Sequence, residues 1–440
     1  MNELERLVKL LKTQHVFLTG GGGVGKSYLC NQLISDYRSR AKQVVVLGST
    51  GISAVHVGGQ TIHSFFAFGI SPDVDAMMRN DRYNRQRIKE MNKVLSSCDL
   101  LIIDEISMVS SELMEMIRYR LVNGKFEGSL LFVGDFFQLP PVVKRSSDGL
   151  WKESLFAFES TAWQVFEPTI VTLQTPKRTH DLGFFSVLNR IRRGAVDHEV
   201  MSYLERLRTN VHVWEESPTI LFGRNAEAEK MNRTRLAELE SDLIVMSAQE
   251  KLHDKSLHVK RMESWKKALP VPEKMELKVG AHVLFCTNKW GKYYNGEHGI
   301  VRFIDDESIG VEKESGMVNV ERHEFTLHET VSVNGEVEEK PVASIHQFPL
   351  KLAYAITIHK SQGMSIERLV CNVDHIFETS QFYVAVSRAK DPNVLHIHYS
   401  YPNFAEHINR CVRVDKRVVD FYEHNPSVTI EDNAGQPQLF

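Results

Sequence analysis

A glycine-rich segment near the start of the chain has the spacing of a phosphate-binding loop. It fits the pattern G-x-x-x-x-G-K-[ST] and lies between an apolar, strand-like segment and an amphipathic one. A loop without side chains can turn its backbone N–H groups toward phosphate oxygens at the start of a helix. We therefore predict a nucleotide site at Gly20, Gly21, Gly22, Gly23, Val24, Gly25, Lys26 and Ser27.

Two residues of this loop carry functional groups. Lys26 is expected to reach the β- and γ-phosphates, and the Ser27 hydroxyl is expected to hold Mg²⁺. Four consecutive glycines could instead form a flexible linker. The flanking strand and helix patterns favour the nucleotide site.

The chemistry needs acidic and polar groups close to the phosphates. The segment CDLLIIDEISM (98–108) is an apolar strand that ends in Asp104 and Glu105. Beside a phosphate loop, Asp104 would enter the Mg²⁺ shell and Glu105 would position and deprotonate the attacking water. A strand that simply enters a solvated loop is the alternative. After the strand 129–135, Gln138 could contact the γ-phosphate or the water, or could be a polar residue before a double-proline turn.

Composition limits the class of protein. The chain has 440 residues, 42% of them apolar and 25% charged, as expected for a soluble globular protein of two or three domains. Its net charge of −3 neither supports nor excludes nucleic-acid binding. The five cysteines form no C-x-x-C pair, which argues against a zinc module and a disulfide framework. No segment has the length or composition of a signal peptide or membrane span, so we expect a cytoplasmic protein that binds no membrane.

The elements that position these residues follow from periodicity. Strand and helix patterns alternate through the first ~175 residues, which predicts a parallel sheet with its loops at the carboxyl edge. Residues 67–97 interrupt this alternation with a helix that has Ile88, Met91, Val94 and Leu95 on one face. Residues 279–345 are predicted to form short strands, with a hairpin turn at Asn334-Gly335.

Six segments occur in an order that is specific to one family: 48–70 (GSTGISAVHVGGQTIHSFFAFGI), 100–108 (LLIIDEISM), 134–142 (GDFFQLPPV), 156–163 (FAFESTAW), 355–369 (AITIHKSQGMSIERL) and 381–390 (QFYVAVSRAK). Together they closely resemble the Pif-type DNA helicases of superfamily 1B, which are related to the RecD and Dda helicases. The resemblance runs from about residue 15 to about residue 400.

This resemblance implies an α/β fold with two tandem RecA-like P-loop NTPase domains. The first would span residues 1–175, with a small wedge insertion at about 67–97. The second would span 176–425, with an insertion at about 234–345 that contains a small β-barrel. Residues 426–440 would form a flexible tail. For 67–97 a plain surface helical hairpin is the alternative.

The resemblance also assigns roles at the nucleotide, which would be ATP with Mg²⁺ bound between the two domains. Arg178 and Arg388 would be arginine fingers supplied by the second domain, neutralising charge on the γ-phosphoryl group. A surface ion pair is the alternative for either arginine. Gln362 and Gln381 would couple the nucleotide to the DNA track.

Single-stranded DNA would contact both domains. In the first, the resemblance implies contacts at Thr50, Gly51, His63 and Phe65, although His63 and Phe65 taken alone would be interpreted as core residues. In the second it implies contacts at Thr357, His359 and Lys360. Hydroxyls and N–H groups suit phosphates, and rings can stack on bases without reading them.

The resulting hypothesis is an ATP-dependent DNA helicase, acting as a monomer in DNA replication, repair or recombination. It would move 5′ to 3′ on single-stranded DNA and unwind forked or partial duplexes. Two alternatives share many of these features: a DNA-stimulated ATPase that moves or displaces proteins without processive unwinding, and a non-enzymatic adaptor. The adenine-contacting glutamine motif of the family is absent, with Asn2 a candidate substitute, and 126–128 keep only a trace of its signature element.

The chain ends in QPQLF, which resembles the short peptide that docks bacterial replication and repair proteins on the sliding clamp. Gln436 would bind the pocket rim, while Leu439 and Phe440 would fill an apolar pocket. This motif suggests a bacterial or phage source. A frayed end with accidental apolar residues is the alternative.

Overall fold

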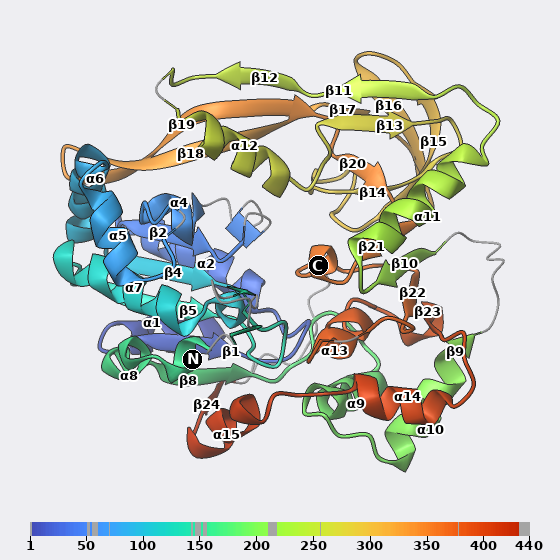
Figure 1. Ribbon diagram of the computed structural model, residues 1–440, viewed down its shortest axis with the longest axis horizontal. Coiled ribbons are helices and arrows are strands. Elements are labelled where there is room, and N and C mark those ends of the chain that lie inside the picture. Colours follow the sequence, from blue (N-terminus) through green and yellow to red (C-terminus); the bar gives the residue numbers. More distant parts are fainter. Residues whose placement is uncertain are drawn as a thin grey trace. The chain divides into compact units, whose positions relative to one another are not determined.

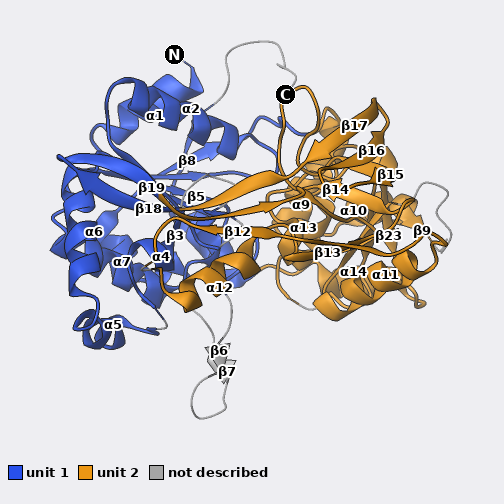
Figure 2. Ribbon diagram, turned by 90° about the horizontal axis from the view of Figure 1, so that it is seen from above, with its two compact units in different colours: residues 1–178, 328–340, 415–440 blue, residues 179–327, 341–414 orange. Residues whose placement is uncertain are grey.

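The computed structural model describes residues 2–50, 53–54, 60–69, 71–141, 144–145, 151–152, 156–209, 218–255, 257–376 and 378–430. The chain forms two compact units, which Figure 2 shows in different colours. Unit 1 contains residues 1–178, 328–340 and 415–440, and unit 2 contains 179–327 and 341–414. This division differs from the expected one, because two later segments fold onto the first unit.

Unit 1 is built around a seven-stranded parallel sheet in the order β24-β8-β1-β5-β4-β2-β3. The strands are β1 (Val16–Thr19), β2 (Val44–Gly48), β3 (Gln60–Thr61), β4 (Leu100–Asp104), β5 (Ser129–Val133), β8 (Thr169–Leu173) and β24 (Val428–Ile430). Every residue of β1 and β2 is buried, as expected for parallel strands covered on both faces. The predicted parallel sheet is thus confirmed.

Helices cover this sheet (Figure 1). They are α1 (Glu3–Leu11), α2 (Lys26–Ser39), α4 (Ile62–Phe65), α5 (Val74–Asp81), α6 (Arg85–Ser97), α7 (Ser111–Asn123), α8 (Thr161–Phe166) and α15 (Lys416–His424), with 3-10 turns η1 (Ile106–Met108) and η2 (Ala157–Glu159). The antiparallel strand pair β6 (Lys144–Arg145) and β7 (Trp151–Lys152) also belongs to unit 1. In α1, Asn2 is the N-cap, and its side-chain oxygen accepts a hydrogen bond from the N–H of Glu5 at 2.8 Å. This cap gives Asn2 a structural role.

The interruption predicted at 67–97 consists of the helix pair α5 and α6. On α6, Met91, Val94 and Leu95 are buried, as the periodicity predicted. The pair is fixed to α7 by Arg120, which is buried and forms two hydrogen bonds with the Asp81 carboxylate at 2.6 and 2.7 Å. The insertion is therefore a packed part of unit 1.

Residues 328–340 also belong to unit 1, although the sequence places them far from its sheet. They are the turn end of the hairpin β18 (His323–Val333) and β19 (Glu336–Gln347). Gln60 donates to the Thr330 hydroxyl at 2.7 Å, and the side-chain oxygen of Gln43 accepts from the N–H of Val337 at 2.8 Å. Both contacts lie beside β2 and β3.

Unit 2 contains a five-stranded parallel sheet in the order β21-β10-β22-β23-β9. Its strands are β9 (Arg208–Thr209), β10 (Thr219–Phe222), β21 (Ala355–Thr357), β22 (Leu369–Asn372) and β23 (Leu395–His398). Its helices and 3-10 turns are α9 (Leu182–Arg192), α10 (His198–Leu207), α11 (Asn225–Ala237), α13 (Gln381–Val386), α14 (Phe404–Cys411), η3 (His359–Ser361) and η4 (Pro392–Val394).

An antiparallel region interrupts unit 2, as the strand patterns predicted. It contains β11 (Ile244–Ser247), β12 (Gln249–Leu252), α12 (Val259–Ala268), β13 (Lys274–Leu277), β14 (His282–Phe285), β15 (His298–Ile304), β16 (Ser308–Lys313), β17 (Gly316–Glu321), β20 (Leu350–Leu352) and the base of the β18–β19 hairpin. Strands β11, β13, β14, β15, β16, β17 and β20 share one hydrophobic core that includes Met275, Phe285 and Val311, while Leu327 of β18 and Val342 and Ala343 of β19 belong to a separate cluster. The hairpin turn lies at Asn334 and Gly335, both with positive φ, as predicted from their types.

Candidate nucleotide and DNA sites

The glycine-rich loop connects β1 to α2, and three of its glycines have backbone angles that side chains rarely adopt. Gly20, Gly23 and Gly25 have φ values of 144°, 82° and 90°. A Cβ atom at Gly20 would lie 2.5 Å from the Leu173 carbonyl oxygen. The loop therefore needs glycine both for its conformation and for its close approach to the end of β8.

The two functional residues of the loop begin α2. The Lys26 ammonium donates to the carbonyl oxygens of Gly20 and Gly21 at 2.7 and 3.0 Å, which holds it at the opening of the loop. Ser27 follows in the first helical turn and is exposed. A phosphate at this helix N-terminus would meet backbone N–H groups, the helix dipole and one ammonium.

The predicted acidic pair lies at the carboxyl end of β4. Glu105 adopts a left-handed conformation, with φ 54° and ψ 49°. For a residue with a Cβ this conformation is strained, and such strain concentrates at functional sites. Gly134 at the end of β5 leaves room for this turn, since a Cβ there would lie 3.0 Å from the N–H nitrogen of Ile106.

Asp104 has a perturbed proton affinity. Burial, and after it the charge of the neighbouring Glu105, raise the pKa of Asp104 to about 7. The N–H of Glu105, which donates to Asp104 at 2.9 Å, and the Lys26 ammonium act in the opposite direction. Because the ionised form of Asp104 is unfavourable in the folded protein, a bound cation would stabilise it.

Gln138 follows β5 and is buried. Its N–H donates to the Asp135 carbonyl at 2.8 Å, and the N–H of Phe137 donates to the Asp135 carboxylate at 3.2 Å. These bonds fix the loop that carries Gln138. Because β1, β5 and β4 are neighbours in the sheet, Lys26, Gln138 and the acidic pair lie at one sheet edge.

Arg178 belongs to unit 1 and packs against the glycine-rich loop. The N–H groups of Lys177 and Arg178 donate to the Gly23 carbonyl at 2.8 and 3.0 Å, and the Arg178 Cβ would be 2.6 Å from a Cβ at Gly23. Arg178 was expected to come from the second domain. In the structure these backbone hydrogen bonds instead tie Arg178 to unit 1. Its role at the phosphates stays a prediction.

Arg388 belongs to unit 2 and is almost fully buried. Its guanidinium donates to the carbonyl oxygens of Val384, Ser361 and Met364 at 2.9, 3.4 and 3.4 Å. The arginine thus links α13 to the turn that follows η3. Gln381, also buried, begins α13, and the half-buried Gln362 ends η3, so both proposed coupling residues lie on the two elements that Arg388 connects.

The DNA-contact residues of unit 1 differ in exposure. His63 on α4 is exposed, with its ring 6.0 Å from that of Phe68. Phe65 on the same helix is only 5% exposed and packs edge-on against Phe66, so its ring is a core ring and the stacking role expected for it needs correction. The Thr50 hydroxyl accepts from the N–H of Ser53 at 3.1 Å. Gly51 lies outside the described residues.

The corresponding residues of unit 2 lie together at the end of β21. Thr357 is buried, and its hydroxyl accepts from the N–H of Lys360 at 3.4 Å. His359 contacts the Glu378 carboxylate at 3.2 Å, and Lys360 is exposed to solvent. Of the three, His359 and Lys360 have side chains accessible to a phosphate.

One residue near the candidate nucleotide site, Tyr422, was not predicted from the sequence. The Tyr422 hydroxyl on α15 is 2.8 Å from the Thr19 hydroxyl, at the end of β1, and accepts from the N–H of Phe136 at 3.4 Å. Its ring stacks on Phe137 with a centroid distance of 4.9 Å. No motif surrounds Tyr422, so no local signal marks it. Gln436, Leu439 and Phe440 of the predicted clamp-binding peptide lie outside the described residues.

A phosphate loop after a central strand of a parallel sheet, with an acidic pair ending a nearby strand, defines a P-loop nucleoside triphosphatase. Residues 2–201 match the family described as PIF1-like helicase, and residues 308–413 match one described as helicase. The ATP-dependent DNA helicase Pif1 of Campylobacter jejuni is 42% identical, over 97% of this chain and 98% of the relative. That of Bdellovibrio bacteriovorus is 34% identical, over 93% and 88%. The chain belongs to the PIF1-like helicase family.

Solved structures agree with this assignment. Pif1 from Bacteroides in complex with ADP-AlF4 has a TM-score of 0.81 and 27% identity, with 96% of each chain covered. Pif1 from Candida albicans has a TM-score of 0.71 and 28% identity, with 96% of this chain and 98% of that chain covered. The two parallel sheets are accordingly those of tandem RecA-like domains. No helix in the described part of the chain is long and apolar enough to cross a membrane.

Proposed function

We propose that this chain moves 5′ to 3′ along single-stranded DNA and separates duplex DNA ahead of it, in replication, repair or recombination. As a member of the PIF1-like helicase family it is an ATP-dependent DNA helicase. The direction of movement and the pathway are our proposal, and they rest on the resemblance to superfamily 1B. The single observation that carries the enzymatic part is the intact set of Lys26, Asp104, Glu105 and Gln138 at one sheet edge.

The DNA substrate has support from relatives. Bacteroides Pif1 has been solved bound to single-stranded DNA, also together with ADP-AlF3, and a further structure concerns unwinding of forked duplex DNA by two coordinating Pif1 helicases. We assign the same classes of substrate to this chain. We further propose that it acts as a monomer in the cytoplasm.

ATP hydrolysis would use the residues of unit 1 as follows. The Lys26 ammonium and the loop N–H groups bind the phosphates and neutralise their charge. The Ser27 hydroxyl and the Asp104 carboxylate would hold Mg²⁺, which would polarise the phosphate oxygens. Glu105 orients a water molecule toward the γ-phosphorus and accepts its proton. The new P–O bond forms as the bond to the ADP oxygen breaks, and ADP and phosphate leave.

The two arginines would complete this arrangement. A guanidinium near the γ-phosphoryl group stabilises the charge that develops in the transition state. Arg178 is close to the phosphate loop through its backbone, whereas Arg388 is tied to the turn that carries His359 and Lys360. We propose that Arg388, Gln362 and Gln381 relate the state of the nucleotide to the strength of the DNA grip in unit 2.

A second candidate function is a DNA-stimulated ATPase that moves along single strands or displaces proteins without processive unwinding. It would use the same ATPase residues and the same DNA-binding residues, so only a strand-displacement assay separates the two. The insertion α5–α6 favours unwinding, since it corresponds by position to the wedge of the family.

We also propose that the segment QPQLF binds a bacterial sliding clamp through Gln436, Leu439 and Phe440. Support comes from the residue types and spacing alone. The expected result of deleting 436–440 is loss of clamp binding with unchanged ATPase activity. No binding of the clamp by the intact protein would contradict the proposal.

The proposed function is tested with partial duplexes that carry a 5′ or a 3′ single-stranded overhang, using the wild type and Lys26→Ala. We expect ATP-dependent unwinding only from the 5′ overhang. Without the Lys26 ammonium, transition-state charge is left uncompensated, and the rate of ATP hydrolysis should fall by at least about a hundredfold.

Two outcomes would contradict the proposal. Unwinding only from the 3′ overhang would overturn the direction of movement. Wild-type ATPase and unwinding rates in Lys26→Ala would overturn the assignment of the nucleotide site. Single-strand-stimulated ATPase without any strand displacement would favour the second candidate function.

A further inference from the structure

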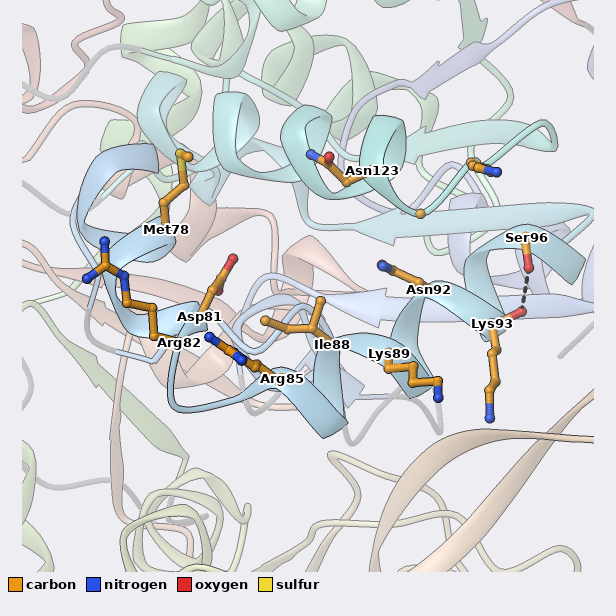
Figure 3. A pocket seen from close by; sticks show the side chains of 12 residues that line it. Met78, Asp81, Arg82, Arg85, Ile88, Lys89, Asn92, Lys93, Ser96 and Asn123 are labelled. Carbon is orange, nitrogen blue, oxygen red and sulfur yellow. Dashed lines mark hydrogen bonds between the residues drawn. The ribbon is translucent and has the colours of Figure 1, made fainter.

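We propose that a basic groove on the α5–α6 insertion binds the phosphate backbone of the displaced DNA strand, the one along which the protein does not move. The proposal rests on the proposed function, because only an unwinding enzyme produces such a strand. We use the name basic groove for the hollow lined by Arg82, Arg85, Lys89, Lys93 and Lys125 together with Asp81 and uncharged neighbours (Figure 3). Its volume is about 700 Å³.

The charge of the groove is strongly one-sided. Five of its lining residues are cationic and exposed, whereas Asp81 is its one acidic lining residue among those that the structure describes. The Asp81 carboxylate is already engaged by Arg120 through two hydrogen bonds. The chain as a whole has a net charge of −3, so this concentration of positive charge does not reflect a generally basic surface.

Most of these cations have no internal partner to explain them. Lys93 forms an ion pair with Glu90 at 2.9 Å, one turn along the same helix. Within the described ranges, no ion pair is formed by Arg82, Arg85, Lys89 or Lys125. A solvated helix face usually alternates charges of both signs. Here the cations instead face one hollow.

The spacing along α6 suits a linear polyanion. Arg85, Lys89 and Lys93 are each four residues apart, and therefore lie on one helix face about 6 Å apart along the axis. Arg82 precedes this row and Lys125, after α7, adds a charge from a second element. A row of this kind can bind several successive phosphates of one strand.

The opposite side of α6 connects the groove to the DNA-contact helix of unit 1. Arg87 is two residues from both Arg85 and Lys89, which on a helix places it on the other face. Its guanidinium donates to the Ser64 carbonyl oxygen, next to His63 on α4. The insertion therefore presents one face to the segment predicted to hold the tracked strand and its basic face elsewhere.

These features favour the backbone of a single strand. None of the lining residues is aromatic, among the residues that the structure describes, so the groove offers no platform for stacking bases. Binding would be through phosphates and independent of sequence. The tracked strand has its own predicted binding residues at α4, which leaves the displaced strand as the occupant of the groove.

The test compares two substrates that differ only in the displaced strand. One is a partial duplex with a 5′ overhang, and the other is a fork that has in addition a 3′ tail on the second strand. The test variant is the double substitution Arg85→Glu and Lys89→Glu. The matched control is Lys9→Glu with Lys12→Glu, which reverses two exposed charges on α1 and just beyond its end, in the same unit. Both test positions are exposed, and a glutamate in the first turn of α6 is compatible with the helix dipole.

We expect the test variant to bind the fork about tenfold or more weakly than the wild type does. The slope of log affinity against log salt concentration for the fork should become shallower by about 0.7 for each phosphate that the variant no longer binds. Affinity for the 5′-overhang duplex and single-strand-stimulated ATPase activity should stay at the wild-type level, as should every value for the control variant.

Other results would overturn the inference. Unchanged fork affinity would show that the displaced strand does not bind there, and would leave the groove for another anionic partner such as an acidic peptide. An equal loss on both substrates would assign the groove to the duplex arm or to the 5′ single-stranded overhang, which both substrates contain. Failure of the proposed function is recognised separately, because it would appear in the wild type as absent single-strand-stimulated ATPase or absent unwinding.

Discussion

Asp104 and Glu105 are two adjacent carboxyl groups held at the end of one strand, and the structure tolerates them at some expense of stability. Glu105 has a left-handed backbone, and the pKa of Asp104 is raised to about 7 by burial and by the Glu105 charge. Ionised Asp104 is therefore unfavourable in the protein without a bound cation. The same property makes it a strong ligand once a cation is present.

We predict that Asp104→Asn makes the stability of the protein less dependent on pH. Between an unfolded pKa of about 3.9 and the folded value, the folded protein holds a proton that the unfolded chain lacks. Wild-type stability should therefore fall as the pH rises through this window. Asparagine does not titrate, and it keeps the oxygen that accepts from the N–H of Glu105.

The measurement is the Tm of Asp104→Asn minus the Tm of the wild type, both taken without nucleotide or divalent cation. We expect this difference to increase by roughly 2–4 °C from about pH 5.5 to about pH 8. A difference that is constant across this range would contradict the raised pKa of Asp104. ATPase activity should be lost at both pH values.

The candidate nucleotide residues can be predicted from the sequence because their signal is local. Glycines with positive φ, a lysine at the start of a helix and acids at the end of a strand are each defined by a few neighbours. Phe65 taken alone is interpreted as a core residue, and its ring is buried in the structure, whereas the stacking role came from the family resemblance. Arg178 was assigned to the second domain through the family resemblance, whereas the backbone bond from its N–H to the Gly23 carbonyl ties it to unit 1.

At the scale of elements, the C-terminal helix α15 supports the nucleotide site from outside every motif. Its Phe421 and Tyr422 join an aromatic cluster with Phe17, Phe136 and Phe137. The Tyr422 hydroxyl bonds both the end of β1, before the glycine-rich loop, and the segment that leads to Gln138. Tyr422 is thus a positioning residue for two parts of the ATPase.

We predict that Tyr422→Phe lowers kcat for ATP hydrolysis by roughly three- to tenfold, since two hydrogen bonds worth about 1 kcal/mol each are removed. KM for ATP should change little, because the phosphate loop itself is intact. The phenylalanine ring keeps the stacking on Phe137, so only a small fall in Tm is expected.

Tyr83→Phe is the matched control, since Tyr83 is 88% exposed and lies on the insertion. It should leave kcat and Tm unchanged. If Tyr422→Phe lowered Tm without any change in kcat, the role of Tyr422 would be structural only. The helix and its strand partner could not be predicted from sequence, because β24 pairs with β8 across more than two hundred residues of chain.

At the scale of the whole molecule, the P-loop unit is completed by distant parts of the chain. Unit 1 takes residues 328–340 from the β18–β19 hairpin and residues 415–430 from the C-terminal segment. The latter adds α15 and the edge strand β24 next to β8, as Figure 1 shows. Without β24, β8 would become an open edge of the sheet. Without α15, the aromatic cluster would be exposed.

Two truncations, one after Val414 and one after Ile430, should have different effects on the ATPase. The first removes α15 and β24, and with them the buried Phe421, Val418 and Ile430 side chains. Loss of this apolar burial and of one strand of the sheet should lower Tm, promote aggregation and abolish ATP hydrolysis. The second removes only 431–440, so Tm, ATPase activity and unwinding should match the full-length protein, while any binding to a sliding clamp should disappear. In the sheet, β24 is the edge strand beside β8. If truncation after Val414 left Tm and ATPase activity at the wild-type level, the first RecA-like domain would fold and work without α15 and β24, and the prediction would be wrong.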